Sequence, residues 1–160
     1  MKTFKLSLVL ALVLVPLTAF AEIPWSGSPG ASAVDESAAA LYEADTSTLG
    51  FKSGASTGTI VGRLNLTDTS ATGYPAWTTM EIRGYDPGAT SDVRAKLMRI
   101  SGGTISNVAT CSLSDNAMVQ TVTCSIPQVD FNSGYIYVVQ VEVGRTSTSV
   151  SPFISGVKIY

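Results

Sequence analysis

The chain contains no histidine among its 160 residues, and only 14% of its residues are charged. Without imidazole it cannot build a Ser-His-Asp triad, a Cys-His nucleophile or the usual catalytic zinc site. The charged fraction is well below the roughly 25% typical of soluble domains, so uncharged polar residues must cover much of the surface. Any activity would therefore depend on carboxylates or aromatic rings.

Long apolar runs are also scarce, and the longest one lies at the start of the chain. Lys2 and Lys5 precede an apolar stretch over residues 6–17, and small residues follow it. This arrangement is typical of a cleavable secretory signal, because about a dozen apolar residues are too few to cross a bilayer as a helix. We expect residues 1–21 to be removed, leaving a secreted or periplasmic protein with no membrane span after signal cleavage.

Positive charge is too scattered to favour a nucleic acid or an anionic membrane as a partner, because both require clustered Lys and Arg. The chain carries a net charge of −2 even with the two lysines of the leader included. Arg94 and Lys96 alternate along one predicted strand, and we interpret them as a solvated face. Because few charges protect the strand edges, we expect a protein partner or self-association, with carbohydrate as the alternative partner.

The chain has only two cysteines, Cys111 and Cys124. Their spacing differs from that of redox pairs, and without histidine we expect neither a metal site nor a cofactor. In an oxidising compartment the pair predicts a disulfide, worth about 3 kcal/mol for a loop of about 14 residues in the chain-entropy model. We predict that it links two strands through a wide loop centred near Ala117 and Met118; the alternative is a bond that is not a simple cross-strand link.

From Thr59 onward apolar and polar residues alternate, and turn residues separate the runs. This pattern predicts an all-β fold, an antiparallel β-sandwich of the jelly-roll or Ig-like kind with about seven strands. The predicted strands are 59–66, 77–83, 92–100, 105–113, 118–126, 135–143 and 152–160, with 135–143 in a central position. Residues 22–58 form an N-terminal arm with one short helical turn over 33–42, and residues 59–160 form the sandwich domain.

Carboxylates offer one route to catalysis, because a glycosidase or lyase needs two acids held in one cleft. Most of the candidates lie in predicted turns or on solvated strand faces, so we expect no enzymatic activity. The candidates are Glu81, Asp86, Asp92, Asp130 and Glu142.

Aromatic rings offer a route to ligand binding. Tyr74, Trp77 and Tyr85 flank one predicted strand and could line a shared carbohydrate-binding surface. Large aromatic residues more often fill a core, and we favour that interpretation for Trp77.

Four segments also support a family resemblance: GRLNLT at 62–67, QVDFNSGYIYVV at 128–139, VGRTST at 143–148 and GVKIY at 156–160. Together they resemble a family of secreted bacterial β-sandwich proteins of unknown function. The resemblance implies a bacterial exported sandwich and carries over no catalytic or ligand residue.

We therefore expect an exported, non-enzymatic protein with a structural or interaction role at the cell surface or in the periplasm. The arm at 23–32 and the low-charge strand edges would mediate its contacts. The alternatives are a carbohydrate-binding module and a two-carboxylate glycosidase or lyase.

Overall fold

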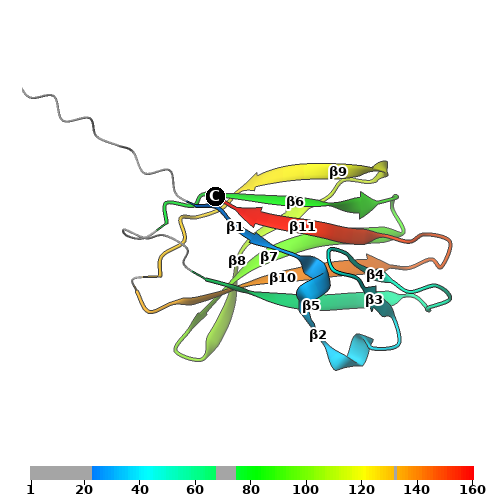
Figure 1. The fold of residues 1–160 in the computed structure, drawn as a ribbon, viewed down its shortest axis with the longest axis horizontal. Helices are drawn as coiled ribbons and strands as arrows, with labels where there is room; N and C mark the ends of the chain where they lie inside the picture. Colours follow the sequence, from blue (N-terminus) through cyan, green and yellow to red (C-terminus); the bar gives the residue numbers. More distant parts are fainter. Residues whose placement is uncertain (1–22, 68–74, 132) are drawn as a thin grey trace, which may run out of the picture.

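The computed structural model describes residues 23–67, 75–131 and 133–160. It is a sandwich of two antiparallel β-sheets, which confirms the predicted fold class (Figure 1). Sheet I has the strand order β3-β4-β11-β6-β9, with β1 also paired to β11, and sheet II has the order β2-β5-β10-β7-β8. The predicted leader and Tyr74 lie outside the described residues.

The seven long strands lie close to the seven predicted ones. They are β5 (Gly58–Leu66), β6 (Thr79–Asp86), β7 (Ser91–Ser101), β8 (Thr104–Ser112), β9 (Asn116–Ser125), β10 (Ile136–Arg145) and β11 (Phe153–Ile159). Of the connections between them, only that from β7 to β8 stays within one sheet, and all the others cross the sandwich. Strand β10 pairs with both β5 and β7, so its predicted central position is confirmed.

The N-terminal segment corrects the prediction of a simple arm and of about seven strands in all. It contributes four further strands, β1 (Trp25–Gly27), β2 (Ala33–Val34), β3 (Tyr42–Ala44) and β4 (Leu49–Phe51), which brings the described total to eleven. In place of a helical turn over 33–42 there is a 3₁₀ turn at Glu36–Ala38, and a second one lies at Pro29–Ala31. The carboxylate of Asp35 caps the later turn by accepting a hydrogen bond from the Ser37 amide.

The core lies between the sheets, where the inward residues of each long strand meet. Met80, Ile82, Leu97 and Val141 are all fully buried, which follows from the period-two alternation. Trp77 is only 1% exposed, which confirms the interpretation that it fills the core. It lies just before β6, which begins at Thr79.

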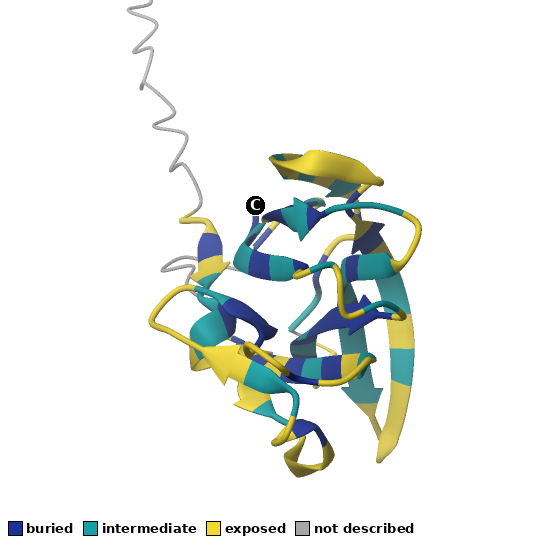
Figure 2. Cartoon of the chain, turned by 90° about the vertical axis from the view of Figure 1, so that its right-hand side faces the viewer, coloured by how far each residue is buried: buried dark blue, intermediate teal, exposed yellow. Residues whose placement is uncertain are grey.

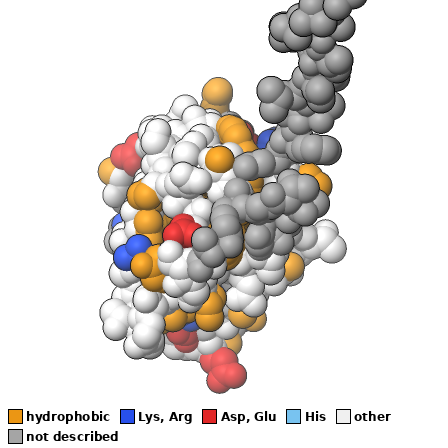
Figure 3. All heavy atoms as spheres, turned by 90° about the vertical axis from the view of Figure 1, so that its left-hand side faces the viewer, with side chains coloured by type: hydrophobic (Ala, Val, Ile, Leu, Met, Phe, Trp, Pro, Cys, Tyr) orange, Lys and Arg blue, Asp and Glu red, His pale blue; other side chains and the backbone are white. Residues whose placement is uncertain are grey.

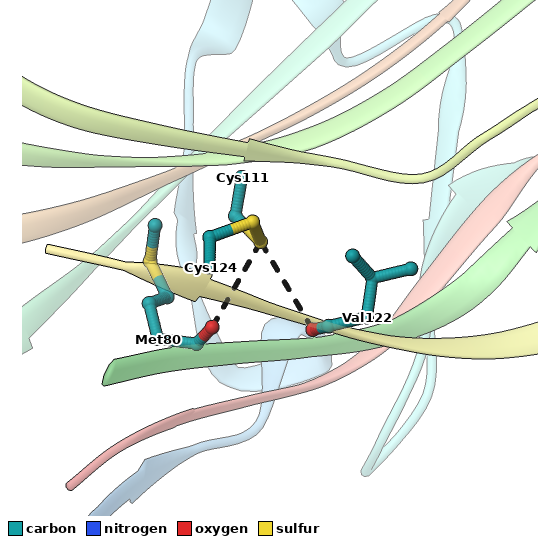
Figure 4. Close-up of a disulfide and its surroundings, with 4 residues drawn as sticks. All are labelled: Met80, Cys111, Val122 and Cys124. Carbon is teal, nitrogen blue, oxygen red and sulfur yellow. Dashed lines mark hydrogen bonds between the residues drawn. A yellow bond between two sulfur atoms is a disulfide. The ribbon is translucent and has the colours of Figure 1, made fainter.

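Cys111 and Cys124 form the predicted disulfide, but the predicted wide hairpin loop is wrong. The bond joins β8 of sheet II to β9 of sheet I, because the chain crosses between the sheets at residues 113–115 (Figure 4). Its Cα atoms are 5.6 Å apart, whereas packed sheets are usually about 10 Å apart, so the sheets converge at this side. The Cys111 sulfur lies 3.8 Å from the Met80 carbonyl oxygen; a disulfide sulfur carries no proton, so this is a packing contact.

Candidate functional site

A charged cluster lies on the outer face of sheet II, across the two neighbouring strands β7 and β10. The Glu142 carboxylate accepts hydrogen bonds from Arg94 Nε at 2.5 Å, Lys96 Nζ at 2.6 Å and Gln140 Nε2 at 2.7 Å. Arg94 also forms an ion pair with Asp92, with 2.9 Å between Nη1 and Oδ2. The alternating Arg94 and Lys96 therefore do share a face, but they hold a buried carboxylate there.

The cluster keeps Glu142 ionised. Burial raises the pKa of Glu142, but the hydrogen bonds from Lys96, Arg94 and Gln140 outweigh that effect and hold the pKa below its ordinary value. A glycosidase acid needs the opposite shift, because it must keep its proton near neutral pH. The ionised Glu142 side chain therefore links β10 to β7.

The five candidate acids do not gather in one cleft. Asp86 is buried at the end of β6, where it accepts a hydrogen bond from Ser91 Oγ. Glu81 lies on the outer face of sheet I, and Asp130 lies in the loop before β10. The Arg94 guanidinium forms ion pairs with both Asp92 and Glu142, so both carboxylates are already neutralised by a cation.

A shallow polar hollow of about 520 Å³ lies beside Asp92, at the end of the charged cluster. Gly144 is one of its lining residues and lies between Thr59 and Asp92 on the adjoining strands. Hydroxyl groups line it together with Asp92 and Arg145, and none of the other four candidate acids does. The Arg145 guanidinium donates hydrogen bonds to the carbonyl oxygens of Ala55, Ser56 and Val150. Exposed hydroxyl groups of this kind offer little selectivity for a ligand.

Tyr85 lies on the outer face of sheet I and is half-buried. Its ring packs against Phe153, with 5.7 Å between centroids and 35° between the ring planes. Gly50 lies next to Phe153 in the same row, and Glu43 next to Gly50. Of the three predicted ligand-binding aromatics, Tyr85 is therefore the one that the structure places on a surface, while Trp77 is buried and Tyr74 is outside the described residues.

The two sides of the sandwich are closed to different degrees. On one side, β2 pairs with β5, while β1 and β4 pair with β11. On the other side, β8 and β9 end their sheets, and in the described part of the chain no strand pairs with their outer edges. Figure 2 shows β9 as the uppermost ribbon, coloured exposed over most of its length.

The two open edges also differ from each other. The pairing of β8 with β7 shifts between Leu97 and Met98 of β7, which leaves Val108 of β8 as an extra residue in the middle of the edge. Such a bulge interrupts the hydrogen-bonding pattern that a further strand would need. In β9 the only shift lies before Val119, and the stretch from Val119 to Ser125 pairs with β6 without interruption.

Neither open edge carries a charged side chain. Strands β8 and β9 contain no Lys, Arg, Asp or Glu. Large apolar side chains are exposed on them, with Ile105 at 63%, Met118 at 66% and Val119 at 51%. Ile105 extends a row with Ile100 and Ile136 on the outer face of sheet II. The part of the sandwich surface visible in Figure 3 shows few charged side chains, in keeping with the composition.

No protein-family model matches the chain, and no curated protein matches it significantly. Both findings are consistent with a resemblance to a family of unknown function. Among solved structures, a chain described as "CBM4 structure and function" is 14% identical, with 85% of this chain and 81% of that chain covered and a TM-score of 0.35. At that level the likeness carries no argument about function.

Within the described residues, no helix has the length and apolar character needed to cross a membrane. In the same part of the chain, no three His, Cys, Asp or Glu side chains gather as a metal site would require. The open edge of β9 and the Tyr85–Phe153 pair are surface features on which a partner can bind. Phe153 was missed from the sequence because its position beside Tyr85 depends on the pairing of β6 with β11, strands that are far apart in the chain.

Proposed function

We propose that the protein is an exported, non-enzymatic β-sandwich that acts by binding an extended strand along the open edge of β9. The observation that supports this most directly is the stretch from Val119 to Ser125, which is regular, uncharged and free of proline. An edge of this kind presents unpaired N–H and C=O groups in a straight row, which another strand can pair with.

The N-terminal arm has no such role in this proposal. Its backbone pairs with β11 through Trp25 to Gly27, and the Trp25 side chain is buried. This pairing and the buried ring hold the arm against the sandwich. The exposed apolar residues at the start of β9, Met118 and Val119, lie where a bound strand would cover them.

Hydrogen exchange of the mature, oxidised protein tests the proposal. The probe is a synthetic, end-capped peptide of alternating Thr and Val, added to dilute protein. We expect it to slow exchange at the edge-facing amides of β9 and to leave those of Gly62 and Arg63 on β5 unchanged, because β2 already pairs with these two residues. Slowing at β5 alone, or no slowing at all, would contradict the proposal.

Carbohydrate binding is the second candidate, and the Tyr85–Phe153 pair is the observation that favours it. Two half-buried rings on a rigid sheet face offer an apolar surface on which a sugar ring can stack. A hollow of about 150 Å³ beside Phe153 adds the carboxylate of Glu43. The 35° tilt between the rings makes this surface bent rather than flat.

Affinity electrophoresis through gels containing dextran, starch or hydroxyethyl cellulose tests this second candidate. Retardation by one polymer, lost in Y85A and in F153A but kept in T121A, would support it. Equal mobility of all four proteins in every gel would leave strand binding as the remaining proposal.

A further inference from the structure

The hydrogen bonds between β9 and β6 fix which backbone groups of β9 face outward. The Ile126 amide, next after β9 in the same register, donates to the Thr78 carbonyl oxygen at 2.8 Å. Because antiparallel pairs alternate between hydrogen-bonded and non-hydrogen-bonded, every second residue from Ile126 turns its N–H and C=O toward β6. The residues between them turn those groups toward the open edge; they are Val119, Thr121, Thr123 and Ser125.

We infer that the strand bound at this edge is β9 of a second copy of the chain, paired antiparallel about a two-fold axis at Val122. This inference rests on the proposed function and names its partner. In a two-fold antiparallel pairing, residues at equal distances on either side of the axis lie opposite each other. Only an axis at Val122, the middle of the stretch from Val119 to Ser125, pairs every residue of that stretch. That pairing places Val119 opposite Ser125 and Thr121 opposite Thr123, so every edge-facing N–H and C=O meets a partner.

The chemistry of the edge also fits a second copy. In a two-fold pairing, a charge close to the axis would face its own copy and repel it, and β9 has none. Thr121 and Thr123 are instead opposite each other, a cross-strand pair that stabilises antiparallel sheets.

The charges on the neighbouring strand weakly favour the same register, and only in low salt. On β6, Glu81 lies beside Thr123 and Arg83 lies beside Thr121. The pairing centred on Val122 therefore puts Glu81 and the second copy's Arg83 at the two ends of one row, three strand spacings or about 14 Å apart. A register centred on Thr121 would instead put Arg83 in one row with Arg83 of the second copy. A register centred on Thr123 would put Glu81 in one row with Glu81 of the second copy.

Sedimentation velocity of the mature chain over a dilution series tests the inference, with two double variants that differ only in sign. T121K/T123K places lysine opposite lysine at both cross-strand pairs, and we expect it to be monomeric at all concentrations. T121E/T123K places glutamate opposite lysine at both pairs, and each new charge also lies beside an opposite charge on β6. We expect this variant to dimerise at least as strongly as the unmodified chain in low salt.

The control is T110E/S112E, which adds two charges to the bulged edge of β8, and we expect its dimerisation to be unchanged. Circular dichroism melts of all variants establish that each one folds. A monomeric unmodified chain, or loss of the dimer in T121E/T123K, would overturn the inference. If the Thr-Val peptide still protected β9 in that case, strand binding would stand and the second copy would be the wrong partner.

Discussion

The two sides of this sandwich close their sheets in opposite ways. On the β5 and β11 side, the N-terminal segment adds short strands that pair along β11 and with Gly62 and Arg63 of β5. On the β8 and β9 side, a bulge interrupts one edge, a disulfide joins the two sheets, and the second edge is left regular. Strand β9 is thus the long strand with an uninterrupted open edge, which is why we place the proposed function there.

The largest expected effect comes from loosening the closed side. Trp25→Ala removes a side chain that is 7% exposed and that packs between the sheets where β1 meets β11. We expect it to lower the free energy of unfolding by about 4 kcal/mol, the usual cost of truncating a buried tryptophan. Urea denaturation measures the change, with Ser26→Ala, the exposed neighbour on the same strand, as the control. Equal stability of the two variants would mean that β1 does not hold this side closed.

Removing the disulfide tests the open side. The double variant C111A/C124A should lose about 3 kcal/mol, because the loop between residues 111 and 124 is no longer constrained in the unfolded chain. Thermal denaturation with and without dithiothreitol measures it: reductant should destabilise the unmodified chain and leave the variant unchanged. A reductant effect that persists in the variant would contradict this account.

The charged cluster holds the open half of sheet II to its central strand, since Glu142 on β10 binds Arg94 and Lys96 on β7. Glu142→Gln should cost about 2 kcal/mol at pH 7, the scale of hydrogen bonds to a buried charge. Glu43→Gln, at an exposed position on β3, is the control.

The cluster also predicts how stability depends on pH. Because the folded-state pKa of Glu142 lies below its ordinary value of 4.5, its ionised form stabilises the fold above that value. This stabilisation is lost as the pH falls through the lower folded-state pKa. The stability difference between the unmodified chain and E142Q should therefore shrink on acidification, measured by urea denaturation at a series of pH values. A difference that grows toward acid pH would show that the sign is wrong.

The long strands were predictable because their alternation extends over many residues and because one face of each is buried. The strands of the N-terminal segment were not. A three-residue strand such as Leu49–Phe51 has no period to detect, and all three of its residues are buried. Its pairing with β11 joins segments that are about 100 residues apart, which no local pattern reveals.

The candidate site was also only partly predictable from the sequence. The partners in the disulfide followed from the count of two cysteines, but its position between the sheets did not, because spacing cannot show where a chain crosses a sandwich. Arg94 and Lys96 were placed correctly on one strand face, while their contact with Glu142 depends on the register between β7 and β10. The absence of charge in β9 was visible in the sequence, but that β9 ends a sheet became visible only in the structure.

The smallest effect is expected on the open edge itself, and it separates free amides from paired ones. Thr123→Pro removes an amide that faces outward from β9, so we expect it to cost only about 1 kcal/mol in dilute, monomeric protein. Val122→Pro removes the neighbouring amide, which faces β6, and leaves a carbonyl there unpaired; it should cost at least about 2 kcal/mol more. Urea denaturation of both variants measures this difference. Equal costs would mean that Thr123 already has a backbone partner and that β9 is not an open edge, whereas the expected inequality shows that its outward groups are free to bind a strand.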